Sequence, residues 1–377
     1  MAEAPAVFGP EERLARLRLI RTERVGPVLF RRLIATYATG AAALAALPEL
    51  ARRGGARRPL ALCPAATAEA ELAALERLGV AAVFLGETAY PSLLAEVADA
   101  PPVLACHGCI GLLARPAVAI VGARNASAAG RRLAADLARG LGEAGYVVAS
   151  GLARGIDAAA HQAALVSGTV AVVAGGVDVV YPAENRALHE AIAREGAVLS
   201  ELPPGTVPQA AHFPRRNRII AGLSRGVVVV EAAFGSGSLI TARLALEQGR
   251  EVFAVPGSPL DPRARGCNDL IRQGATLTEG AADVVAGLQG WVAPRRDDRV
   301  EEEEAVAAGA ADDDALLARA RAAILEVLGP TPVEVDEILR QCQVTPAVAR
   351  IVLLELELAE RLERHPGNKV ALAFRDR

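Results

Sequence analysis

The chain has 377 residues, of which 52% are apolar, and a formal net charge of −3. This length predicts a large core and roughly two or three domains, and no apolar run is long enough to cross a membrane. Residues 297–314 hold nine acids and one arginine, a charge of −8, which leaves +5 on the rest of the chain. The negative total therefore does not exclude an anionic partner.

Cysteine usage indicates a reducing compartment. The five cysteines are odd in number and scattered, and no signal peptide opens the sequence, so we expect a cytoplasmic protein. Cys106 and Cys109 have the spacing of half a zinc knuckle, but no second pair follows at a matching distance. We predict no metal site and no cofactor.

Residues 1–75 are predicted to form a small helical domain. Residues 11–50 show helical apolar periodicity, broken at Val25-Gly26-Pro27. The break fits a turn in a small bundle, and it also resembles a helix-hairpin-helix, whose glycine turn presents backbone N–H groups to a DNA phosphate. The segment is thus predicted as a helix-hairpin-helix or SAM-like domain.

Residues 76–290 are predicted to form an α/β domain. Short β-branched runs alternate with alanine-rich helical stretches; these runs are 118–121, 146–149, 169–173, 227–230 and 251–255. Continuous apolar strands separated by helices are typical of a doubly wound parallel sheet, here an extended Rossmann-like one. Ligands of such sheets bind beyond the carboxyl ends of the strands.

The first turn at that edge is Gly122-Ala123-Arg124-Asn125-Ala126-Ser127. It lacks the spacing of a dinucleotide fingerprint and the lysine of a P-loop. Its backbone N–H groups at a helix start and the Arg124 guanidinium suit a phosphate. The alternative is a structural arginine paired with a carboxylate.

The second turn, residues 150–161, contains Ser150, Arg154, Asp157 and His161. Ser150 does not lie in a G-x-S-x-G elbow, so a hydrolase is not favoured. We expect Asp157 to be an N-cap or first-turn acid, paired structurally with His161. No catalytic residue is predicted here.

The densest cluster of phosphate-binding residue types is His212–Ile220, just ahead of an apolar helix start. It places three arginines, Asn217 and Phe213 within seven residues. A third turn, Gly235-Ser236-Gly237-Ser238, either cradles a phosphate or is a tight turn capped by a serine. Several phosphate sites in a row suggest a nucleic-acid strand. Aromatic residues are scarce, so base stacking would depend on rings such as Phe213 and Tyr181, and affinity would be mainly electrostatic.

The C-terminal part is predicted as an acidic flexible linker, 291–314, followed by a winged-helix-like domain, 315–377. Helical patterns cover 315–328, 333–340 and 346–360, and a hairpin covers 361–372. The third helix has Glu355, Glu357 and Glu360 near its end, so reading of a DNA major groove is doubtful. A protein-interaction role and a weak DNA role remain alternatives.

Six segments together resemble the DNA processing protein A (DprA, or Smf) family: 120–124, 150–157, 181–185, 213–224, 236–241 and 253–257. The resemblance implies an extended Rossmann domain that binds single-stranded DNA without nucleotide hydrolysis. It also implies a homodimer formed through that domain and a role in protecting incoming DNA and loading the RecA recombinase during natural transformation. The chain would not be an enzyme.

Carried over by motif, the resemblance assigns DNA binding to fourteen residues. These are Gly122, Arg124, Asn125, Ser127, Arg154, Phe213, Arg215, Arg216, Asn217, Arg218, Gly235, Ser236, Gly237 and Ser238. Many members carry a lysine three residues before the phenylalanine, where this chain has Ala210. One phosphate contact fewer would make the salt dependence of binding shallower.

A more distant resemblance gives an alternative of another class. The glycine and serine turns are similar to those of nucleoside-monophosphate phosphoribohydrolases of the lysine-decarboxylase-like group, which are enzymes. Their Pro-Gly-Gly-x-Gly-Thr-x-x-Glu motif is absent, because the residues after Gly237 read Ser-Leu-Ile-Thr-Ala-Arg with no glutamate for the ribose.

Overall fold

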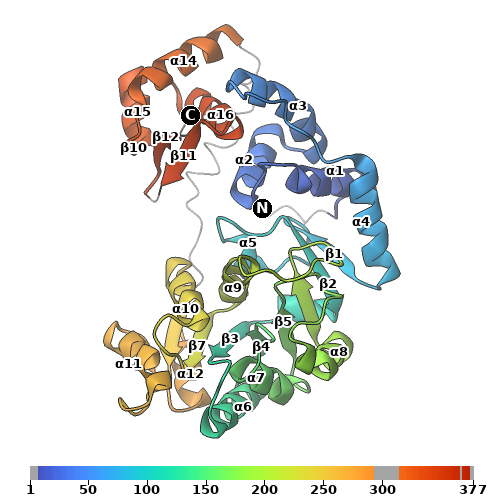
Figure 1. Ribbon diagram of the computed structural model, residues 1–377, viewed down its shortest axis with the longest axis vertical. Helices are drawn as coiled ribbons and strands as arrows, with labels where there is room; N and C mark the ends of the chain where they lie inside the picture. Colours follow the sequence, from blue (N-terminus) through green and yellow to red (C-terminus); the bar gives the residue numbers. More distant parts are fainter. Residues whose placement is uncertain (1–6, 293–313, 366, 374–377) are drawn as a thin grey trace. The chain divides into compact units, whose positions relative to one another are not determined.

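The computed structural model describes residues 7–292, 314–365 and 367–373 (Figure 1). The described residues fold into two compact units. The first begins at Ala70 and contains the central part of the chain, and the second combines Phe8–Glu69 with the C-terminal part. The acidic linker predicted over 291–314 falls, apart from its ends, outside the described residues. The predicted domain borders at 75, 290 and 314 stay predictions.

The first unit is built on a nine-stranded sheet in the order β1-β2-β6-β5-β4-β3-β7-β8-β9. Neighbours from β6 to β9 are parallel, whereas β2 is antiparallel to both β1 and β6. The strands are β1 (Ala81–Phe84), β2 (Val103–Gly108), β3 (Ala117–Gly122), β4 (Val147–Ser150), β5 (Thr169–Val172), β6 (Ala197–Ser200), β7 (Gly226–Val230), β8 (Glu251–Ala254) and β9 (Thr276–Leu277). The predicted doubly wound parallel sheet is confirmed, with an antiparallel edge that the apolar runs did not indicate.

Helices cover both faces of this sheet, which explains why its strands are apolar throughout. Along β3, Val118 and Ile120 face one cluster, and Ala117, Ala119 and Val121 face the other. The first cluster receives α6 (Ala128–Glu143), α7 (Ile156–Ala164) and α12 (Ala281–Gly287). The second receives α5 (Ser92–Ala95), α9 (His212–Leu223), α10 (Gly237–Glu247) and α11 (Arg265–Arg272). A smaller cluster holds α4 (Ala65–Arg77) and α8 (Arg186–Glu195).

The order of the strands reverses between β3 and β7. The chain leaves β3 toward β4 on one side, and it leaves β7 toward β8 on the other, so the two neighbouring strands mark a topological switch point. A Cβ at Gly122 would lie 1.9 Å from the Val230 carbonyl oxygen, so only glycine fits where β3 ends. The turns after β3 and β7 therefore leave the sheet side by side at the edge where ligands bind.

The second unit contains a small helical bundle and a winged helix. The bundle is α1 (Pro10–Arg21), α2 (Pro27–Tyr37) and α3 (Gly40–Arg53). The winged helix is α14 (Asp314–Val327), β10 (Val333–Glu334), α15 (Val335–Cys342), α16 (Pro346–Leu358), β11 (Leu362–His365) and β12 (Lys369–Leu372). The predicted N-terminal helical domain and the predicted winged-helix-like domain are therefore confirmed. Among the described residues no single helix is long and apolar enough to span a membrane. The helices α2 and α3 together have the length and composition of a span, but they are bent by 106° relative to each other.

Candidate nucleic-acid interface

A pocket opens at the carboxyl ends of β4 and β5, beside the turn that follows β3. It measures about 470 Å³ when the solvent at its mouth is included. It is lined by Arg124, Gly151, Ala153, Arg154, Val173, Ala174, Gly175, Val179, Tyr181, Pro182, Pro208, Phe213 and Arg216. The parallel sheet thus gathers segments that are far apart in the sequence into one site, at the edge that strand order predicts.

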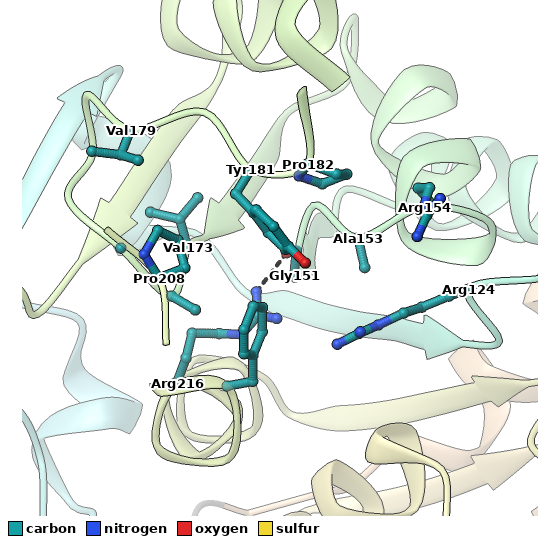
Figure 2. Close-up of a pocket in the computed structure, with 13 residues that line it drawn as sticks. Arg124, Gly151, Ala153, Arg154, Val173, Val179, Tyr181, Pro182, Pro208 and Arg216 are labelled. Carbon is teal, nitrogen blue, oxygen red and sulfur yellow. Dashed lines mark hydrogen bonds between the residues drawn. The ribbon is translucent and has the colours of Figure 1, made fainter. Parts of the chain in front are cut away.

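Two aromatic rings and one arginine form the mouth of the pocket. The Tyr181 and Phe213 ring centroids are 5.6 Å apart with an interplanar angle of 59°, and the Arg124 guanidinium carbon lies 5.3 Å from the Phe213 centroid. Figure 2 shows Arg124 directed across the pocket toward Tyr181 and Arg216. Tyr181 is 50% exposed and Arg124 is exposed. A cation above an aromatic face that keeps open area suits a base and its phosphate together.

Arg216 forms the floor of the pocket and does not reach out from it. The residue is buried, and its Nη1 donates to the Gly151 carbonyl oxygen at 2.6 Å (Figure 2). It also donates to the Val172 carbonyl oxygen. Burial lowers the pKa of this arginine to about 10, while the charge of Asp157 opposes that shift. Arg216 thus holds the ends of β4 and β5 together beneath the pocket, and its predicted contribution of positive charge to DNA binding stays a prediction.

Arg218 is also committed to partners inside the protein. Its guanidinium donates to Glu201 and to the Asp99 carbonyl oxygen at 2.6 Å, and its side chain is 8% exposed. This arrangement corrects the predicted role of Arg218, because a guanidinium already held by a carboxylate is not free for phosphate. Of the three arginines in the run, only Arg215 is exposed.

The N-terminus of α6, a predicted phosphate site, is occupied by a carboxylate of the chain itself. Ser127 is the N-cap, accepting from the Gly130 N–H at 2.9 Å, and Glu231 accepts from the Ser127 N–H at 2.9 Å and from its hydroxyl. Glu231 reaches this position from the end of β7 with a φ of 54°. The negative charge favours the helix terminus, so a direct phosphate contact by Ser127 is corrected to a structural role.

The third turn joins the site through Asn217. Its amide nitrogen donates to the Gly237 carbonyl oxygen at 3.2 Å, and the Ser236 and Ser238 hydroxyls are 2.8 Å apart. Gly235 has a φ of 75°, which favours glycine, and Ser236 is the N-cap of α10 without a side-chain capping bond. Asn217 therefore positions the turn, and the start of α10 has no capping bond from the side chain of its N-cap residue.

The Asp157 and His161 side chains take separate partners, contrary to the predicted pair. Asp157 accepts from the Gly151 and Ala153 N–H groups at 3.2 and 3.3 Å, which shapes the turn beneath the pocket. His161 contacts the Thr169 hydroxyl at 2.7 Å, and burial lowers its pKa to about 3. The expected first-turn acid is confirmed in position, but its bonds go to the preceding loop.

Comparison with known proteins decides the family. Residues 81–289 match the family described as DNA recombination-mediator protein A. Residues 10–74 match the DprA-like N-terminal HHH domain, and residues 307–368 match the DprA winged helix domain. The chain belongs to the DNA recombination-mediator protein A family.

Individual members of the family agree with this assignment. The chain is 50% identical over 199 residues to DNA processing protein DprA of Streptococcus pneumoniae, covering 52% of this chain and 70% of the relative. It is 39% identical over 289 residues to protein Smf of Escherichia coli, covering 75% of each chain. The resemblance inferred from the sequence motifs is thus confirmed.

Two solved structures of the family resemble this one. The DprA structure from Streptococcus pneumoniae aligns with a TM-score of 0.62 at 37% identity, covering 74% of this chain and 98% of that one. The second is described as showing the single-stranded DNA binding mode of DNA processing protein A from Helicobacter pylori. It aligns with a TM-score of 0.50 at 31% identity, covering 53% of this chain and 92% of that one.

Sequence reasoning about the family site missed some of what surrounds the motifs. Glu231 was not singled out, and Pro182 and Pro208 were not expected in the pocket wall. The sequence signal for Glu231 was present, because an acid directly after a buried strand must lie at the ligand edge of the sheet. Its partner Ser127 lies 104 residues away in the chain, so the pairing itself had no local signal. Asn125 and Arg154 are exposed, with Arg154 held 3.4 Å from Glu184, and their predicted DNA contacts stay predictions.

Proposed function

We propose that this protein binds single-stranded DNA along the rim of the Arg124 pocket. The observation that carries the proposal is the placement of the Arg124 guanidinium over Phe213, next to the open ring of Tyr181. An unpaired base can stack on the open face of Tyr181, beside Phe213, while its phosphate meets Arg124. A paired base cannot enter without leaving its stack, so single strands are favoured over duplex.

The exposed cations of the same edge supply the remaining affinity. Arg215 lies in the first turn of α9, the helix that carries Phe213, and Arg154 lies in the turn after β4, so a strand crossing the pocket meets further positive charge. Neither arginine reads a base edge in this arrangement. Binding is therefore expected to show little sequence preference and to weaken as salt rises.

The proposal includes no nucleotide hydrolysis. The described residues that line the pocket include no carboxylate, histidine, serine, threonine or cysteine, so Tyr181 is their one candidate nucleophile or general base. The family relationship further supports a role in DNA processing during natural transformation. We propose that the bound strand is protected and passed to the RecA recombinase, and that the protein acts as a homodimer formed through its Rossmann domain.

Fluorescence anisotropy over a salt series, with single-stranded and duplex oligonucleotides of the same sequence, tests the proposal. Tighter binding of the single strand at every salt concentration is the expected result. An assay for base release from AMP, run beside it, tests the phosphoribohydrolase alternative. Equal affinity for both DNA forms, or efficient base release, would overturn the assignment.

A further inference from the structure

A second basic depression lies outside the Rossmann domain, in the unit formed by the helical bundle and the winged helix. It encloses about 1710 Å³ with its open solvent and is polar. Its charged lining consists of Arg24, Arg57, Arg58 and Arg361 with Glu23 and Glu360. We call these six residues and the space between them the bundle–wing groove.

The walls of the groove are fixed by close backbone packing. A Cβ at Gly54 would lie 2.0 Å from the Glu355 carbonyl oxygen, so the end of α3 meets the last turn of α16 with no room for a side chain. Arg361 Nη1 donates to the Gly54 carbonyl oxygen at 3.3 Å. Leu354 and Leu358 of α16 are buried in the core of the bundle. The groove is therefore a permanent feature of this unit.

Part of the positive charge in the groove has no carboxylate partner among the described residues. Arg24 lies 3.5 Å from Glu360, and these two side chains largely neutralise each other. Arg57 and Arg58 are both exposed, and neither makes a salt bridge or side-chain hydrogen bond with any residue in the ranges that the structure describes. Arg57 and Arg58 follow each other in the chain and carry the same charge, and a bound anion relieves the repulsion between like charges.

The same packing removes the usual DNA-reading element of a winged helix. On one side α16 contributes Leu354 and Leu358 to the bundle core, and on the other it contributes Val352 and Leu356 to the winged-helix core. Glu355 is fully buried and paired with Arg321. A helix enclosed on both sides cannot enter a major groove, so a duplex has no recognition element here.

We propose that the bundle–wing groove binds the phosphate backbone of single-stranded DNA, as a second site in addition to the Arg124 pocket. A basic groove that follows a backbone needs guanidinium groups and open width, and it needs no base-reading helix. Arg57 and Arg58 contact consecutive phosphates, and Arg361, directed from the opposite wall, limits the path of the strand. The winged helix thus acts as one wall of a strand channel.

The test uses the full-length chain with Arg57→Ala and Arg58→Ala combined. The control is Arg319→Ala with Arg340→Ala, which removes the same charge from exposed positions of the same unit that do not line the groove. Each neutralised phosphate contributes about 0.7 to the log-log salt slope on a single strand, so the groove variant should lose about 1.4 on a long oligothymidylate. When salt is raised from about 50 to 200 mM, the affinity of the groove variant should therefore fall about sevenfold less than the affinity of the parent.

The control variant and Arg57→Lys with Arg58→Lys should keep the parental slope. A parental slope in the Arg57→Ala and Arg58→Ala variant would overturn the groove proposal. So would an equal reduction in the control, because the effect would then follow net charge alone. A loss seen equally with duplex DNA would overturn the choice of a single strand.

Hydrogen exchange of the full chain with the same long oligonucleotide separates this proposal from the function of the pocket. Protection of residues 55–58 and of the wing, together with protection near Arg124, supports both sites. Protection near Arg124 alone overturns the groove and leaves the pocket intact. Protection at the groove alone overturns the pocket instead.

Discussion

Replacing Arg124 with alanine separates a DNA contact from a structural role. Arg124 is exposed, makes no salt bridge with the residues that the structure describes, and contacts the Phe213 ring at 5.3 Å. An exposed cation–π contact is worth about 0.5–1 kcal/mol, so unfolding should change little. Loss of a charge-assisted phosphate bond of about 1.5–3 kcal/mol should weaken binding of single strands by about 10-fold to 100-fold.

Arg218→Ala is the matched comparison, because Arg218 lies in α9, five positions after Phe213, but its side chain points inward. Removing it leaves Glu201, whose side chain is 13% exposed, without its partner. Breaking a buried pair costs about 3–5 kcal/mol. We therefore expect Arg218→Ala to lower the midpoint of urea unfolding and to leave the salt slope of the folded protein unchanged.

Both variants are measured by anisotropy across a salt series, and both are also followed by circular dichroism during urea unfolding. Arg124→Ala should reduce the salt slope by about 0.7 on every DNA sequence alike, because one phosphate contact is lost. An unchanged slope in Arg124→Ala, or a reduced slope in Arg218→Ala under conditions where it is folded, would refute the assignment of the two arginines.

Three further predictions follow from the site and its supports. Phe213→Leu should weaken single-strand binding by about 1–3 kcal/mol in an anisotropy titration, because a stacking surface is lost. The salt slope should stay unchanged, because no charge is removed, and a change of slope would count against stacking. Ser127→Ala should destabilise the protein by about 1 kcal/mol in thermal unfolding, because it removes the α6 cap and a hydrogen bond to Glu231. Unchanged stability together with weaker DNA binding would instead support a direct contact between Ser127 and a phosphate. The pKa of His161 is lowered by burial to about 3, below its unfolded value of about 6.5, so its neutral form supports stability that is complete above pH 6.5 and declines toward pH 3. Urea unfolding at pH 7 and 5 should show a loss of about 2 kcal/mol from this group, and a His161→Gln variant with the same pH dependence would contradict it.

The sequence alone determined the elements and the edge at which a ligand binds. Short β-branched runs such as 227–230, alternating with helical stretches, indicate strands buried on both faces, and the turns after them lie at the carboxyl edge of a parallel sheet. The winged helix and the helical bundle followed from periodicity and breaks. These features depend on residues close together in the chain, which is why they can be read locally.

The tertiary structure decided which arginines face solvent. Arg215, Arg216 and Arg218 are close in sequence, but successive positions on a helix turn by about 100°, so one points outward, one beneath the pocket and one toward Glu201. The sequence shows that all three residues carry a positive charge, but it does not show in which direction each side chain points.

The same limit applies to contacts between distant segments. Glu231 occupies the helix start at Ser127 from the end of another strand, and Tyr181 meets Phe213 of α9 only after the fold has brought the two segments together. The bundle–wing groove depends on Gly54 meeting Glu355 across 301 positions of the chain. Such pairings are selected by packing of the whole fold, because no local pattern carries information about a partner that far away.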